Sequence, residues 1–161
     1  MSSKGMSHPW VYMIFLVIVF SGALVSSRFG GDGNTTWYKT LYKPPFTPPA
    51  YVFGIVWPIL YVLIAFSGAR IFLSHGEHKT LCLVLWSLQL LVNFLFSWMF
   101  FGLQSPVLGF LNVIVLWILI GLLLLKVYPL DKAAFFALIP YIIWVSLALT
   151  ISFSIMIHPF K

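Results

Sequence analysis

The apolar residues of this chain fall into five long stretches, separated by short polar or proline-rich segments. Each stretch is long enough to cross a hydrocarbon core of about 30 Å as an α-helix. Runs of this length are also too long for core strands. The pattern therefore predicts an all-α integral membrane protein, a bundle of five transmembrane helices over approximately 10–29, 50–73, 81–101, 106–127 and 133–157.

The stretches follow one another closely, so residues 1–161 are interpreted as a single membrane domain. Residues 10–29 follow Lys4 and resemble a signal peptide in part, but the apolar run starts late and continues towards Phe29, which favours a span. Five spans place the termini on opposite sides of the membrane. Lys and Arg are divided almost evenly between these sides, so the orientation stays open.

Residues 30–49 form a long loop between the first two spans. Its two proline pairs, Pro44-Pro45 and Pro48-Pro49, keep the chain extended and remove N–H donors that would be costly to leave unpaired at a membrane boundary. We expect Thr47 to cap the second helix, with the second proline pair in its first turn. Loops of this length often act as lids, so we expect this one to cover a ligand pocket.

The second span carries aromatic residues at helical spacing. Phe53, Trp57 and Tyr61 lie four residues apart, so their rings share one face of the helix. Pro58 removes a backbone hydrogen bond and is expected to kink the helix beside Trp57. A kink beside a row of rings favours a concave surface.

Rings and amides on the other spans are candidates for the remaining walls of the pocket, because ligand sites are mostly apolar with a few placed polar groups. Two alternatives stay open: the amides join helices by hydrogen bonds, and the rings only pack helices together. The candidates are Gln89, Asn93, Phe96 and Phe100 in the third span, Asn112 in the fourth, and Tyr141, Trp144 and Ala148 in the fifth, where Pro140 is a second candidate for a kink.

Composition supports the membrane assignment, since 61% of residues are hydrophobic and 7% are charged, against about a quarter charged in soluble domains. Nine Lys and Arg outnumber three Asp and Glu, but they are scattered and form no nucleic-acid-binding module. Arg28, Lys39 and Lys43 lie near the first loop with Trp37 and Tyr38. They could pair with ligand carboxylates, or belong to an interfacial belt of cations and rings at the lipid headgroups.

Several chemistries are disfavoured. Cys82 is alone, which rules out an intrachain disulfide or a thiolate metal site. His75 and His78 share a short loop with Glu77 and are interpreted as solvated residues, so no metal site is predicted. P-loop, GxSxG and HExxH motifs do not occur. No span contains a carboxylate, so the proton relay of an ion-coupled transporter is also missing from the sequence.

Four spaced motifs resemble the TspO/MBR family of tryptophan-rich sensory proteins, which includes the translocator protein or peripheral-type benzodiazepine receptor. The resemblance covers the chain from about Trp37 to Phe153. The motifs are WY-x2-L-x-KP-x3-PP at 37–49, VF-x3-W-x2-LY at 52–61, Q-x3-N at 89–93 and PY-x2-W at 140–144.

The resemblance implies a five-helix bundle whose first loop covers a pocket. Family members bind porphyrins, other tetrapyrroles, and benzodiazepine-type or isoquinoline drugs. Some degrade porphyrin with light and oxygen, which implies tentative catalytic roles for Trp57 and Trp144. The spans lack His and paired Cys, so a metal-free, protoporphyrin IX-like ligand is expected rather than ligated haem, and no cofactor is required.

Three functions follow from the resemblance: porphyrin binding for sensing, regulation or transport; light-dependent porphyrin degradation; and lipid or small-molecule translocation without catalysis.

Phe46 and Phe96 replace tryptophans that are common in the family and so lack an N–H donor. Residues 148–157 contain no Tyr or basic residue, which disfavours the sterol motif of animal members. A homodimer is possible, and the bilayer is a bacterial envelope or organelle membrane.

Overall fold

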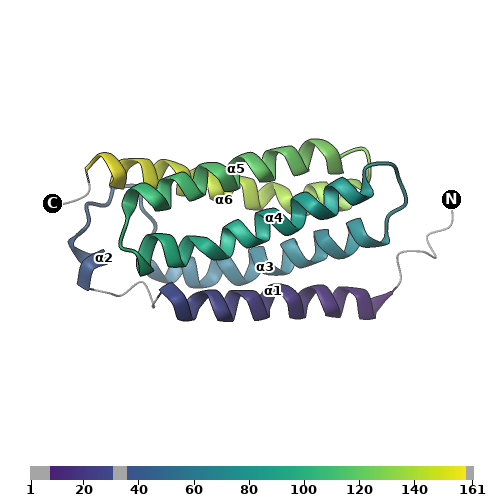
Figure 1. Ribbon diagram of the computed structural model, residues 1–161, viewed down its shortest axis with the longest axis horizontal. Coiled ribbons are helices and arrows are strands. Elements are labelled where there is room, and N and C mark those ends of the chain that lie inside the picture. Colours follow the sequence, from purple (N-terminus) through teal and green to yellow (C-terminus); the bar gives the residue numbers. More distant parts are fainter. Residues whose placement is uncertain (1–7, 31–35, 159–161) are drawn as a thin grey trace.

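A computed structural model describes residues 8–30 and 36–158 of the chain (Figure 1). Residues 31–35, near the start of the predicted first loop, lie outside the described residues. The elements are α1 (Pro9–Gly30), α2 (Thr36–Thr40), α3 (Ala50–Leu73), α4 (Lys79–Ser97), the π-helical turn η2 (Trp98–Gly102), α5 (Pro106–Val127) and α6 (Lys132–Ile157).

The predicted five-span fold is confirmed, because the described residues include five helices that are long and apolar enough to cross a membrane. The second and fourth helices have the predicted bounds, and the other three differ from them by one or two residues at an end. Side-chain caps define where two of the helices begin. At the start of α5, Ser105 Oγ accepts from the Leu108 N–H at 3.2 Å. At the start of α6, Asp131 Oδ1 accepts from the Ala134 N–H at 2.8 Å. Both α3 and α6 continue as helices through Pro58 and Pro140.

The prediction that Thr47 caps the second helix is wrong. Helix α3 begins at Ala50, and Pro49 stands at the cap position in an extended conformation, with ψ 154° and no side-chain cap bond. The proline pair therefore lies before the helix and holds Thr47 too far from the first helical N–H groups. Thr47 instead donates its own backbone N–H to the Pro44 carbonyl at 3.0 Å, and its hydroxyl oxygen is buried without a partner in the described part of the chain.

The five long helices form a closed ring in cross-section. Helix α1 packs against α3 and α4, α3 packs against α6, and α5 lies between α6 and α4. Helices α3 and α4 also contact each other across the ring. The start of α1 and the end of α6 lie at opposite ends of the bundle (Figure 1), as an odd number of spans requires.

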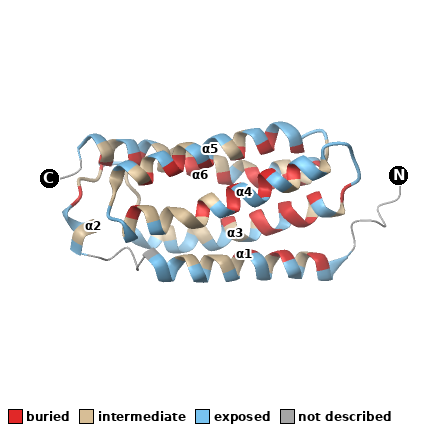
Figure 2. Cartoon of the chain, in the orientation of Figure 1, coloured by how far each residue is buried: buried red, intermediate tan, exposed pale blue. Residues whose placement is uncertain are grey.

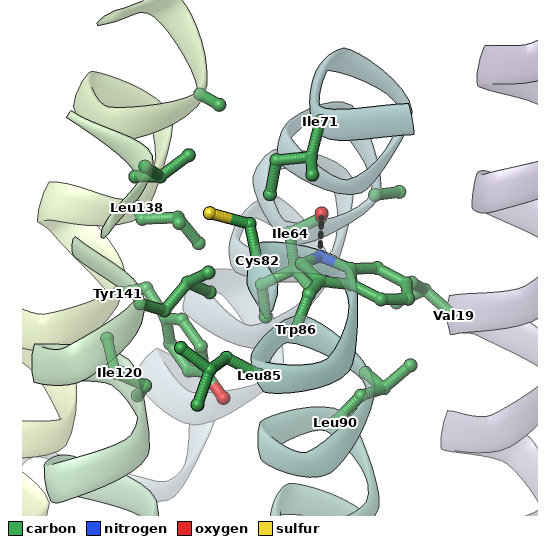
Figure 3. Close-up of a cluster of buried hydrophobic side chains, with 14 of the residues drawn as sticks. Val19, Ile64, Ile71, Cys82, Leu85, Trp86, Leu90, Ile120, Leu138 and Tyr141 are labelled. Carbon is green, nitrogen blue, oxygen red and sulfur yellow. Dashed lines mark hydrogen bonds between the residues drawn. The ribbon is translucent and has the colours of Figure 1, made fainter. Parts of the chain in front are cut away.

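Helices α1 and α3 bury side chains towards one end of the bundle only (Figure 2), whereas α5 and α6 bury them along their length. In α1 the buried residues are Val11, Phe15 and Val19, all in its first half. In the antiparallel α3, none of residues 50–59 is buried, and the buried positions begin at Leu60. We call the part around Ile64, Trp86 and Leu138 the closed half (Figure 3). The opposite part, which contains residues 50–59 and lies next to α2, is the loop-side half.

Hydrogen bonds and close contacts tie the closed half together. The Trp86 indole N–H donates to the Ile64 carbonyl at 3.0 Å, joining α4 to α3 (Figure 3). At the end of this half, the Arg70 guanidinium donates to both carboxylate oxygens of Asp131, through Nε at 3.2 Å and Nη2 at 2.8 Å. The same carboxylate caps α6, so one buried acid fixes the end of α3 to the start of α6.

Small residues let the helices of this one chain approach each other. A Cβ at Gly22 would collide with the Phe94 ring, and Ser26 Oγ donates to the Phe94 carbonyl at 2.7 Å. The small-residue face of α1 therefore contacts α4 of the same chain, and a homodimer stays a prediction.

Gly68 should be the least replaceable glycine in the closed half. A Cβ there would lie 2.6 Å from atoms of both Phe15 and Trp86, whereas a Cβ at Gly121 meets nothing within 4 Å. We expect Gly68→Ala to lower the free energy of unfolding by about 1–3 kcal/mol because the core must be displaced. Gly121→Ala should change it by less than about 0.5 kcal/mol. Unfolding of both variants in detergent measures this, and equal stabilities would contradict the packing described.

Candidate functional site

The first loop is anchored to the bundle by one aliphatic side chain. Leu41 is 0% exposed and forms a second buried cluster with Phe100, Ile151 and Ile155. Trp37 and Tyr38 pack against this cluster, and Trp37 lies 5.4 Å from Phe100 between ring centroids. The loop therefore closes the loop-side half at its end. Sequence analysis placed Leu41 in a motif without a role, although it is the lone leucine among the rings and prolines of residues 36–49.

Lys43 belongs to the internal structure of this loop. Its Nζ donates to the Tyr38 carbonyl at 3.0 Å and to the Leu41 carbonyl at 3.4 Å, and it lies 4.4 Å from the centroid of the Tyr38 ring. Burial raises the pKa of the Tyr38 phenol above its ordinary value of 10.0, so the hydroxyl is neutral at physiological pH. Arg28 and Lys39 are exposed. Pairing of these three cations with ligand carboxylates stays a prediction.

A π-helical turn gathers three phenylalanines beneath the loop. Helix α4 continues into η2, where the Leu103 N–H donates to the Trp98 carbonyl at 2.8 Å. Phe96 and Phe100 stack with centroids 5.3 Å apart, and Phe101 meets Phe100 edge-on at 4.8 Å. Sequence analysis predicted Phe96 and Phe100 as pocket residues but had no signal for the wider turn.

The row of rings on α3 contacts three neighbouring helices. Phe53 meets Trp144 of α6 edge-on, with centroids 5.3 Å apart. Trp57 lies 5.5 Å from Tyr61, and Tyr61 in turn contacts Phe20 of α1 and Phe94 of α4. Both tryptophans are half-buried and pack against the main core. The structure thus places the two tryptophans on the neighbouring helices α3 and α6.

Trp144 also borders a hollow on the outside of the bundle. This hollow of about 370 Å³ lies between α3 and α6 and is lined by Val56, Ile59, Leu60, Pro140, Ile143, Trp144 and Leu147. Ala148, a further predicted pocket residue, is half-buried one turn after Trp144 and packs against the main core. A second hollow of about 550 Å³ lies between α1, α4 and η2, and none of the predicted site residues lines it.

Two amides and a phenol form a continuous hydrogen-bonded chain inside the bundle. Asn93 Nδ2 donates to the Tyr141 hydroxyl at 2.6 Å, and that hydroxyl donates to Gln89 Oε1 at 2.8 Å. Gln89 and Tyr141 are 0% exposed and Asn93 is 7% exposed. Asn112 stands apart from the chain, because its Nδ2 donates to the Val92 carbonyl at 3.0 Å and joins α5 to α4.

Three predicted ligand-binding residues each keep a buried polar atom unused. The Nε2 of Gln89, the Oδ1 of Asn112 and the Nε1 of Trp144 have no hydrogen-bond partner within residues 8–30 and 36–158. A buried polar group without a partner costs about 1–3 kcal/mol. These atoms lie on three of the helices that surround the loop-side half, and a bound molecule with its own donors or acceptors would satisfy them.

Among the residues that the structure describes, no three His, Cys, Asp or Glu side chains form a group that could hold a metal ion. The site is instead one of rings and amides, which bind by stacking, by excluding water and by a few hydrogen bonds.

Comparison with known proteins gives this arrangement its family. The model of the TspO/MBR family matches residues 13–158. The chain belongs to the TspO/MBR family. It is 35% identical to the tryptophan-rich protein TspO of Chlorobaculum tepidum over 88% of each chain. It is also 30% identical to the tryptophan-rich sensory protein of Cereibacter sphaeroides (94% of this chain, 93% of the relative) and 29% identical to the human translocator protein (93% and 91%).

Family membership and the five spanning helices together make this TspO/MBR chain a multi-pass integral membrane protein. The predicted family assignment is confirmed. The roles of the individual site residues, listed by position above, stay predictions.

Leu41 gives a test of how the loop is held. We expect Leu41→Ala to free the loop, because removing a buried leucine leaves a cavity that costs about 2–5 kcal/mol. Limited trypsin digestion in detergent should then cut after Lys39 at least about ten times faster. Phe46→Ala, at a position of the same loop that is 51% exposed, is the control and should leave the rate unchanged. Equal cleavage of both variants would mean that Leu41 is not the anchor.

Proposed function

We propose that this TspO/MBR protein binds flat, mostly apolar ligands of the tetrapyrrole class within its loop-side half, for sensing, regulation or transport. The observation that carries the proposal is the set of unused buried polar atoms on Gln89, Asn112 and Trp144 in a bundle whose loop-side half is rich in aromatic rings. Polar atoms of this kind are expensive in an apolar interior unless a ligand uses them.

The chemistry of the walls indicates the kind of ligand. Phe53, Trp57, Tyr61 and Trp144 offer faces and edges of rings, which favour a planar conjugated molecule. The exposed cations Arg28 and Lys39 lie on α1 and α2, the two elements at the loop-side end. They suit carboxylate side chains such as those of a protoporphyrin IX-like ligand. Relatives named as a sensory protein and as a translocator support a role in signalling or movement of such a ligand.

Replacement of the two tryptophans tests the binding site. We expect Trp57→Phe and Trp144→Phe each to weaken binding of protoporphyrin IX by up to about ten-fold, because an aromatic contact contributes about 0.5–1.5 kcal/mol beyond burial. Affinity is measured by titrating the quenching of the remaining tryptophans in detergent. Trp10→Phe, at a position 59% exposed on α1, is the control. Affinity unchanged in both variants would remove these tryptophans from the site.

A second candidate function is light- and oxygen-dependent degradation of porphyrin. The observation that favours it is the pair of oxidisable rings on α3, with Trp57 and Tyr61 centroids 5.5 Å apart beside the proposed ligand. Trp57 and Trp144 would then take part in the reaction as well as in binding. Translocation without catalysis needs only the binding site.

Absorption spectra during aerobic illumination separate the two functions. If the protein degrades porphyrin, the porphyrin band should fall faster than for free porphyrin and a protein-bound product band should grow. Trp57→Phe and Trp144→Phe should slow this conversion under saturating ligand. Bleaching at the rate of free porphyrin, without a new band, would restrict the function to binding.

A further inference from the structure

We propose that the hydrogen-bonded chain of Gln89, Tyr141 and Asn93 is reversible, so that Gln89 presents either a donor or an acceptor to a flat heteroaromatic ligand. The inference rests on the proposed function, since it assigns the polar recognition of that same site. Tyr141 acts in it as a positioning residue that sets the orientation of the Gln89 amide.

The geometry defines a direction for the chain. Asn93 Nδ2 lies 2.6 Å from the Tyr141 oxygen and can only donate. The single phenolic proton of Tyr141 is therefore free to point to Gln89 Oε1, 2.8 Å away. This arrangement uses the acceptor of Gln89 and leaves its Nε2 donor buried and unpaired within the described chain. We call it the donor arrangement, because a donor is what Gln89 has left to offer.

The same three side chains permit the opposite direction. If both amides rotate by half a turn, Tyr141 donates to Asn93 Oδ1 and accepts from Gln89 Nε2, and Gln89 Oε1 becomes the unused atom. Carboxamide oxygen and nitrogen are nearly equal in size, so this rotation changes the hydrogen bonding with little change of packing. Both hydrogen bonds between the three residues are retained. We call this the acceptor arrangement, because an acceptor is what Gln89 has left to offer.

Because the hydrogen-bonded chain is buried, the direction of its hydrogen bonds affects ligand binding. Gln89 and Tyr141 are 0% exposed, so bulk water does not pair with the free atom of Gln89. A ligand that displaces the side chains beside Gln89 therefore has to match that atom itself. A ligand edge with a carbonyl or imine acceptor selects the donor arrangement. A ligand edge with a pyrrole-type N–H selects the acceptor arrangement. Tetrapyrroles carry groups of both kinds, which a fixed amide would only half satisfy.

Three tricyclic probes of the same shape test the inference. Fluorenone carries a carbonyl acceptor, carbazole carries an N–H donor, and fluorene carries neither. Binding is measured by equilibrium dialysis of the full chain in detergent, against micelles without protein. For the wild type we expect fluorenone and carbazole each to bind about ten-fold more tightly than fluorene, the value of one net hydrogen bond. Wild-type preference for only one of the two would overturn reversibility.

Asn93→Leu should lock the chain in the donor arrangement. Leucine cannot accept the phenolic proton, so Tyr141 must donate to Gln89 Oε1. Fluorenone should then keep its wild-type affinity within about two-fold, which also shows that the variant is folded. Carbazole should fall to the affinity of fluorene. The proposal would be contradicted if, in Asn93→Leu, fluorenone and carbazole both lost their higher affinity over fluorene, or if both kept it.

A double variant distinguishes positioning from direct contact. In Asn93→Leu with Tyr141→Phe, the hydroxyl that holds Gln89 is gone, so its amide rotates freely and carbazole should recover its advantage over fluorene. If Asn93 itself contacted the ligand, carbazole would not recover, and the assignment of Tyr141 would be wrong. Gln89→Leu should abolish both advantages, whereas Ser87→Ala, at an exposed position of the same helix, should abolish neither.

The probes also separate this inference from the proposed function. Binding of fluorene and protoporphyrin IX without any advantage for fluorenone or carbazole would overturn the reversible chain alone. Failure of protoporphyrin IX to bind would overturn the proposed function.

Discussion

The need to satisfy polar groups without water governs this bundle. In hydrocarbon an unpaired backbone group costs several kcal/mol, so the chain crosses the membrane as helices whose N–H and C=O groups bond within each segment. Side chains follow the same rule in the closed half. The Trp86 indole uses the Ile64 carbonyl, and the Arg70 guanidinium uses both oxygens of Asp131. The exceptions within the described spanning helices, on Gln89, Asn112 and Trp144, are therefore the informative atoms of the structure.

The packing of α1 and α3 changes along the bundle. Helices α1 and α3 bury their residues at the closed end, and residues 50–59 of α3 bury none. Loose packing at one end of a bundle leaves side chains room to rearrange around a ligand, while the closed end keeps the helices in place. Leu41 and the rings of η2 cover the loose end. The fold thus combines a rigid frame with an adaptable, covered interior.

Much of this could be predicted from the sequence, because apolar runs of membrane-spanning length have one structural solution. Spacing of four residues also predicted that Phe53, Trp57 and Tyr61 share one face of the second helix. The remaining features depend on contacts that no local pattern encodes. A helix that is apolar all round gives no periodic signal for the extra residue of η2. The cap expected at Thr47 failed because Pro49 is extended, and the pairing of Arg70 with Asp131 joins residues that are distant in sequence.

The double role of Asp131 has a mechanical consequence. Its carboxylate caps α6 and also binds Arg70 at the end of α3. The two helices are therefore held together at this end by an ion pair. They have no comparable ionic pin among the described residues at the other end, where Phe53 meets Trp144 through ring contact alone. Any separation of the two helices would therefore be smallest at Asp131 and would widen towards the loop-side end, past the hollow that Trp144 lines.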